Sequence, residues 1–299
     1  MTRAYVVRAC GRVTLTGLVV SLVGLALASS AGAAPRGIFS VFGGCPVSEV
    51  NGRSEDPVCV YMQTTGMLRL GRVTLPIDKT ITVQAGGLSI EGVGWGLVPP
   101  SGGAMMSKTP LEIPGGLNGL VQCGAFGGRV AQASCGAADG TEVTATIEVV
   151  ASSSDPVTEL GSGFLGEGPL LALPVRVHLG NAFLGNSCYL GSGSHPIMLE
   201  LTFGSTSPPP PNKPISGLRR FHEEIENGLM MIALHPSVLV DNSFMVPVAE
   251  GCGGQLAPLV DPMLDARLGL PSMPGHNTAI LDARVLDQSG VEEVILSEG

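Results

Sequence analysis

Aromatic and charged side chains are both scarce in this chain of 299 residues. Only 4% of the residues are aromatic and only 14% are charged, whereas about 25% are charged in an ordinary globular protein. The hydrophobic fraction of 44% is nevertheless normal, which excludes an intrinsically disordered chain. The net charge of −9 gives no electrostatic attraction toward the phosphates of nucleic acid. We therefore predict no nucleic-acid partner.

The motifs of common enzymes are missing as well. The chain has no G-x-S-x-G nucleophile elbow and no G-x-x-x-x-G-K-[ST] phosphate loop. Ser194 stands beside His195 in a Gly/Ser-rich stretch, but sequence neighbours seldom face each other as nucleophile and base. We predict no catalytic residue and no cofactor-binding residue, and leave open whether the chain is an enzyme.

Candidate metal ligands are scattered along the chain. We expect each histidine to be solvated or structural rather than a ligand; the five are His178, His195, His222, His235 and His276. The chain contains no C-x-x-C pair, the spacing that would indicate a zinc site. Several acidic or amide residues offer oxygen ligands for calcium, but no EF-hand spacing gathers them, and we expect solvated loop carboxylates and helix caps; they are Asp241, Asn242, Asp261, Asp265, Asp282 and Asp287. We predict no metal ligand.

The N-terminus has the three parts of a secretory signal peptide. Arg3, Arg8 and Arg12 precede an apolar run over residues 13–28, and Ala31-Gly32-Ala33 is a small-residue cleavage site. The apolar run is shorter than the ~20 residues that span a bilayer. We predict a signal peptide over residues 1–33 and no transmembrane segment after its cleavage.

Cysteine usage agrees with export. Cys10 would leave with the signal peptide, and an even number of cysteines in an exported chain predicts disulfides. The clustering along the sequence suggests Cys45–Cys59, Cys123–Cys135 and Cys188–Cys252.

Alternating apolar and polar residues predict an all-β fold. In residues 142–149 the side chains of Val143, Ala145, Ile147 and Val149 share one face, and Asp139-Gly140 supplies a turn just before them. With 43 Gly and 23 Pro separating the segments, we predict sandwich-like antiparallel sheets with long Gly/Pro-rich loops and at most short helices. The other predicted strands cover residues 58–64, 67–70, 72–75, 79–84, 110–113, 173–179, 197–203 and 278–286.

Two segments contain residues that are typical of tight turns or of helix ends. Residues 219–226 could form a helical turn, but Asn227-Gly228 followed by an apolar run favours a β-hairpin. His222 and Glu226 would then lie on either side of the bend. Residues 261–269 are the best predicted helix, with Asp261 as N-cap, Pro262 at the first helical position and a stop at Gly269.

The Pro-rich segment 205–214 bears on the domain organisation. Four consecutive prolines indicate an extended, polyproline-like conformation. We interpret the segment as a stiff loop within a single elaborated β domain over residues 34–299. The alternative is a linker that splits the chain into two small β units.

Several short motifs also resemble those of a known family of secreted, disulfide-containing proteins from high-GC Gram-positive bacteria. The family has no assigned activity, and the resemblance implies export, a β-rich single unit and disulfides without transferring a catalytic residue. The motifs that carry it lie in residues 45–46, 59–61, 108–111, 114–117, 173–179, 183–191, 239–242 and 275–279.

Taken alone, the sequence predicts a secreted or extracellular protein, with association to the cell wall left open. We expect a binding or structural module whose partner is an unknown component of the envelope or of the extracellular space. A secreted hydrolase with an unrecognised site and a carrier of an apolar ligand are the alternatives.

Overall fold

The computed structural model describes residues 33–90, 94–100, 103–138, 141–150, 159–160 and 168–299. The predicted signal peptide, apart from Ala33, and the predicted Asp139-Gly140 turn lie outside these residues. Residues 33–299 form one compact unit. Within the described residues, no helix is both long enough and apolar enough to cross a membrane.

The fold is all-β and sandwich-like, as predicted, with 40% strand and 21% helix among the described residues. The strands are β1 (Val58–Leu70), β2 (Val73–Ile90), β3 (Gly94–Val98), β4 (Leu111–Glu112), β5 (Thr144–Val149), β6 (Glu159–Leu160), β7 (Leu171–Gly180), β8 (Tyr189–Leu190), β9 (Ile197–Leu201), β10 (His222–Glu226), β11 (Leu229–Ala233), β12 (Ser237–Asp241), β13 (Ala249–Glu250) and β14 (Thr278–Gly290). The helices are η1 (Gly37–Gly44), α1 (Val47–Val50), α2 (Gly116–Leu120), η2 (Cys123–Ala125), α3 (Arg129–Ala137), η4 (Gly254–Leu256), α4 (Ala257–Leu268) and α5 (Val291–Leu296).

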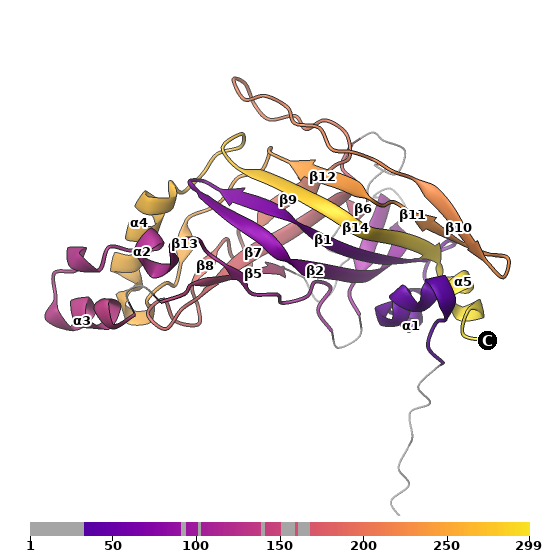
Figure 1. Cartoon of the computed structure of the whole chain (residues 1–299), viewed down its shortest axis with the longest axis horizontal. Coiled ribbons are helices and arrows are strands. Elements are labelled where there is room, and N and C mark those ends of the chain that lie inside the picture. Colours follow the sequence, from indigo (N-terminus) through magenta and orange to yellow (C-terminus); the bar gives the residue numbers. More distant parts are fainter. Residues whose placement is uncertain (1–32, 91–93, 101–102, 139–140, 151–158, 161–167) are drawn as a thin grey trace, which may run out of the picture. The chain divides into compact units, whose positions relative to one another are not determined.

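Two antiparallel layers pack face to face (Figure 1). One layer has β1 between β2 and β14, and continues from β14 through β11 to the edge strand β10. The other has β7 between β5 and β9. Strands β3 and β6 join the layers along one side, and a bridge between Thr202 and Val240 brings β9 and β12 together on the other.

The main core fills the space between the layers. Met62 and Leu68 from one layer belong to the same buried cluster as Leu173 and Val177 from the other. A hollow lined by ten side chains at one end of this core, Leu75 among them, has a volume of only about 10 Å³. A drug-sized ligand needs roughly 300 Å³ or more, so this part of the interior is packed rather than hollow.

A second core lies on the outer face of the first layer, under η1, α1 and α5. Phe39 and Phe42 from η1 pack there with Val50 from α1 and Val294 from α5, and the sheet contributes Cys59 and Met231 among others. This outer face is therefore apolar beneath the helices, and it becomes polar toward the edge strand β10.

The predicted face alternation holds in β5. Ala145 and Ile147 are buried, as is Val143 just before the strand, while Val149 at its end is half-buried. The Asn227-Gly228 hairpin is also confirmed, because both residues have positive φ angles, of 54° and 82°, between β10 and β11. His222 and Glu226, expected on either side of the bend, both lie on β10.

The predicted helix start is wrong by five residues. Helix α4 begins at Ala257, so Pro262 lies inside the helix and Asp261 is not its N-cap. The Asp261 carboxylate instead accepts hydrogen bonds from the backbone N–H groups of Gly251 and Cys252, at 3.1 and 2.8 Å. The helix ends as predicted, with Gly269 in the left-handed conformation.

Three disulfides join the same pairs that the sequence clusters suggest: Cys45–Cys59, Cys123–Cys135 and Cys188–Cys252. The third bridge lies beside the short β8–β13 pair and connects chain segments on either side of the Pro-rich segment. Ser205 and Ser216 pair across that segment, and the Thr206 N–H donates to the Ile215 carbonyl at 2.9 Å. The Pro-rich segment therefore leaves the fold and returns to it at neighbouring positions, which is the geometry of a loop.

Candidate metal centre

Edge strand β10 places His222 and Glu224 on one face of the sheet, because side chains two residues apart in a strand point the same way. His222 pairs with Ala233 of β11, and Ala233 pairs in turn with Asp287 of β14. Residues directly opposite each other in a sheet share a face. His222 and Asp287 therefore lie in one row, separated only by the methyl group of Ala233.

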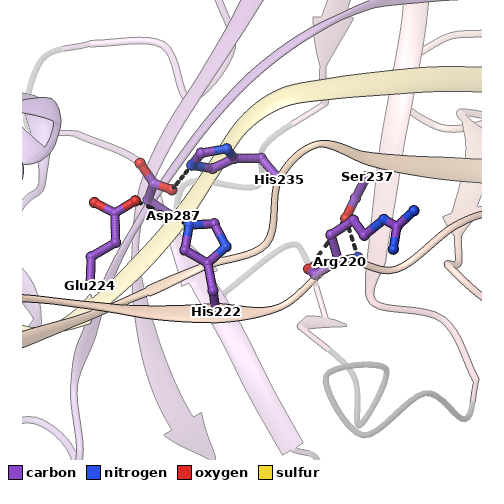
Figure 2. Close-up of polar contacts among 6 residues, drawn as sticks. All are labelled: Arg220, His222, Glu224, His235, Ser237 and Asp287. Carbon is purple, nitrogen blue, oxygen red and sulfur yellow. Dashed lines mark hydrogen bonds and ion pairs between the residues drawn. The ribbon is translucent and has the colours of Figure 1, made fainter.

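His235 joins this row from the connection between β11 and β12. The Leu234 N–H donates to the Leu286 carbonyl at 2.7 Å, which holds the connection against β14. Ser237 fixes its far end, since the Ser237 hydroxyl accepts the Arg220 N–H at 2.8 Å (Figure 2). The same contact fixes the chain just before β10, so Ser237 positions both histidine segments.

The four side chains point toward one another (Figure 2). His222 Nε2 lies 3.1 Å from Glu224 Oε1, and His235 Nε2 lies 3.2 Å from Asp287 Oδ1. The two imidazole rings meet edge to face, with their centroids 5.3 Å apart. One possible ligand atom from each of His222, Glu224 and His235 falls within 4.8 Å of the other two. We call these three residues the metal centre; the Asp287 carboxylate lies beside it, in contact with His235.

The carboxylate of Asp287, beside this centre, is unusual because it is buried. Its side chain is only 4% exposed, against 34% for Glu224, and Oδ1 has no hydrogen bond of acceptable geometry in spite of its approach to His235. Burial raises the pKa of Asp287 to about 6, and the negative charge of Glu224 raises it too, while His235 and His222 act in the opposite direction. A buried carboxylate oxygen without a hydrogen bond calls for a polar or charged partner, and His235 Nε2 at 3.2 Å is the nearest one described.

The donor set fits a small transition-metal ion. Imidazole nitrogen and carboxylate oxygen are common zinc ligands at about 2.0–2.2 Å, usually in tetrahedral geometry. Two such donors on one tetrahedral ion are roughly 3.4 Å apart, close to the 3.1 Å between His222 Nε2 and Glu224 Oε1 in the metal centre. The ligand atoms of His222, Glu224 and His235 lie within 4.8 Å of one another, so side-chain rotations that shorten these separations would be needed to place all three on one ion.

The remaining histidines lie apart from this centre. His178 stacks on Tyr189 with ring centroids 4.9 Å apart. Ser194 Oγ lies 3.1 Å from His195 Nδ1, but both residues are exposed in one turn and, among the described residues, no carboxylate orients that histidine. The pair therefore lacks the third member of a catalytic triad.

Three of the acidic residues considered for calcium, Asp241, Asp261 and Asp265, are used separately, as backbone acceptors. Buried Asp241 accepts the N–H groups of Ser243 and Glu200, and Asp265 accepts that of Ala249. Burial raises the pKa of Asp241 and of Asp265. Asp241 is thus not the solvated loop carboxylate that the sequence predicts, because the chain on either side of it folds into the core.

Sequence reasoning did not anticipate this cluster of His222, Glu224, His235 and Asp287, because its residues come from three segments of the chain. A usable signal was present in the H-x-E spacing of His222 and Glu224 on a strand that the Asn227-Gly228 turn predicts. That spacing puts both side chains on one face. The approach of Asp287, more than 50 residues further along the chain, depends on the pairing of β11 with β14, which no local pattern specifies.

Asp287 also gives the protein a characteristic pH dependence. The pKa in the folded state is raised from 3.8 to about 6, so the stabilisation due to the protonated group is complete below pH 3.8 and is lost as the pH rises through 6. We expect Asp287→Asn, in metal-free protein, to raise the free energy of unfolding relative to the wild type at pH 8. This increase in the free energy of unfolding should be larger at pH 8 than at pH 4, by on the order of 2 kcal/mol. Urea unfolding at both pH values measures it. An equal difference at both pH values would contradict this assignment.

Comparisons of the chain with protein-family models, curated proteins and solved structures found no match. The interpretation of the metal centre therefore rests on its geometry alone.

Proposed function

We propose that this chain is an exported, disulfide-stabilised binding protein of the extracellular space or cell envelope, and that it binds a divalent transition-metal ion, zinc in the first instance. The convergence of His222, Glu224 and His235 ligand atoms within 4.8 Å of one another carries the metal-binding part. Export is supported by the predicted signal peptide and by the three disulfides. N-terminal sequencing of secreted protein tests export, since it should begin at or within two residues of Ala34.

The ligand types favour zinc over calcium or magnesium. Calcium and magnesium take oxygen ligands almost exclusively, whereas two of the three donors in the metal centre are imidazole nitrogens. Borderline transition metals such as zinc accept both nitrogen and carboxylate oxygen. The side chains of His222 and His235 are 46% and 25% exposed, so an ion can enter from solvent.

Loss of a single ligand should weaken zinc binding strongly. We expect His222→Ala and His235→Ala each to lower zinc affinity about tenfold or more, measured by isothermal titration calorimetry on protein freed of metal. Zinc at 100 times its dissociation constant should stabilise the wild type by about 2.7 kcal/mol. The same zinc concentration should stabilise either variant much less.

His276→Ala is the matched control, because His276 is exposed and makes no side-chain hydrogen bond with another described residue. That variant should bind zinc like the wild type. Zinc binding that survives both His222→Ala and His235→Ala, or that falls equally in His276→Ala, would overturn the metal-binding proposal. Neither result would bear on export.

A further inference from the structure

A second feature capable of binding lies where the β1–β2 turn meets helices α2 and α4. A hollow of about 660 Å³ opens there. Its ionisable lining residues are Arg72 and Arg267, and Thr74 adds a hydroxyl group. Leu120 and Leu268 form an apolar wall beside them. The hollow thus combines positive charge with apolar surface.

Backbone carbonyls hold both arginines in place. The Arg72 N–H donates to the Leu268 carbonyl at 2.8 Å, and Arg72 Nη1 donates to the Ala266 carbonyl at 3.1 Å. Arg267 Nε donates to the Gly119 carbonyl at 2.9 Å. Each guanidinium group has five N–H donors, so most of them remain free after these contacts. The two arginines are therefore anchored and still able to bind a ligand.

A third arginine adds to the positive charge. Arg69 of β1 pairs with Thr74 of β2, so their side chains share a face. Arg69 Nε donates to the Gly71 carbonyl at 3.1 Å, within the same turn.

No carboxylate neutralises this charge in the described part of the chain. The ion pairs found there involve neither Arg69, Arg72 nor Arg267. Asp265, the acidic residue nearest to Arg267 in sequence, uses Oδ1 to accept the Ala249 N–H. In a chain with a net charge of −9, a hollow whose ionisable lining is purely cationic is an unusual local environment.

We propose that this hollow binds an oxyanion, a carboxylate or phosphate group of a small molecule, with the remainder of the ligand against the apolar wall. Arginine forks match carboxylate and phosphate oxygens in bidentate geometry. The Thr74 hydroxyl supplies a further donor. The site is separate from the metal centre, and the proposal does not depend on metal binding or on export.

The test uses inorganic phosphate and benzoate as probes, in metal-free protein at constant ionic strength. Isothermal titration calorimetry measures the affinity, and backbone amide shifts of Arg72, Gly119 and Leu268 report the place of binding by NMR. We expect at least one probe to bind and to shift these amides. Tighter binding of phosphate would identify a phosphate ligand, and tighter binding of benzoate would identify a carboxylate attached to an apolar group.

Arg72→Gln and Arg267→Gln should each weaken binding about tenfold. Because the two residues lie on different elements, a folding defect in one variant leaves the other informative, and circular dichroism checks both. Arg53→Gln is the matched control, because it removes the same charge at an exposed position. Like Arg72 and Arg267, Arg53 donates a hydrogen bond to a backbone carbonyl, that of Glu49. The proposal is overturned if neither probe binds at millimolar concentration. It is equally overturned if Arg53→Gln weakens binding as much as the other two variants.

Discussion

Replacing Cys188 and Cys252 together by alanine is expected to lower the free energy of unfolding by about 4 kcal/mol. The bridge closes a chain segment with a sequence separation of 64 residues, and the chain-entropy model relates the stabilisation to the logarithm of that length. Both cysteines are fully buried, so alanine avoids leaving an unpaired hydroxyl group in the core. Guanidinium unfolding of the oxidised proteins measures the difference.

The local bridges provide the comparison. Cys45–Cys59 and Cys123–Cys135 close separations of 14 and 12 residues, for which the same model gives about 3 kcal/mol each. Removal of the long-range pair should therefore destabilise the protein more than removal of either local pair, by about 1 kcal/mol. If removal of either local pair costs more than removal of Cys188–Cys252, packing around the local bridges dominates and the entropic ranking is wrong.

Asn277→Ala is expected to destabilise the protein to a similar extent, by about 3 to 5 kcal/mol. Asn277 is fully buried, and its Oδ1 accepts the Gly71 N–H at 2.8 Å. Its Nδ2 donates to the carbonyls of Phe244, Ser272 and Met273, at 2.9 to 3.1 Å. Alanine would leave the Gly71 N–H and these carbonyls without their buried partner. Urea unfolding followed by far-UV circular dichroism measures the loss.

Two further variants separate hydrogen bonding from volume. Asn277→Asp keeps the shape and the acceptor for Gly71, but it removes both N–H donors and points an oxygen at the carbonyl groups. We expect it to be at least as destabilising as alanine at pH 7. Asn51→Ala, at an exposed position, should change stability by less than about 0.5 kcal/mol. A stable Asn277→Asp variant would show that volume, rather than the donors, accounts for the loss in alanine.

Strand identity was largely predictable, because burial on one face leaves a period of two in the sequence. In β9 the buried Ile197, Leu199 and Leu201 alternate with exposed Met198 and Glu200. The β10–β11 hairpin was predictable for a different reason, since Asn227 and Gly228 are among the few residue types that adopt positive φ readily.

Strand length was not predictable, because a glycine within a strand looks like a break. The sequence suggests separate strands over residues 58–64 and 67–70, whereas β1 is continuous. Gly66 has a φ of 137°, at an irregularity in the pairing with β2, and a Cβ atom there would lie 2.1 Å from the Ile280 carbonyl oxygen. Glycine at this position serves a close approach between strands, which only the three-dimensional pairing reveals.

The sites were less predictable than the fold, for a related reason. Local patterns assign a residue to a strand and to a face, but not to a partner strand. Asp287 reaches His235 only because β11 pairs with β14, and Arg267 lines the same hollow as Arg72 only because α4 ends against the β1–β2 turn. Both arrangements depend on long-range contacts without a local sequence signature.

The pairing of β1 with β14 also has a kinetic consequence. Val58 pairs with Gly290 and Arg69 with Thr278, so most of the chain forms one large loop before these hydrogen bonds close. Closing such a loop costs entropy before any contact repays it, and folds dominated by distant pairings form slowly. The β1–β2 hairpin is local and can form early, which leaves the other edge of β1 unpaired until β14 docks. An unpaired, apolar strand edge is a template for intermolecular β-pairing, so aggregation during refolding, rather than low final stability, is the main hazard of this topology.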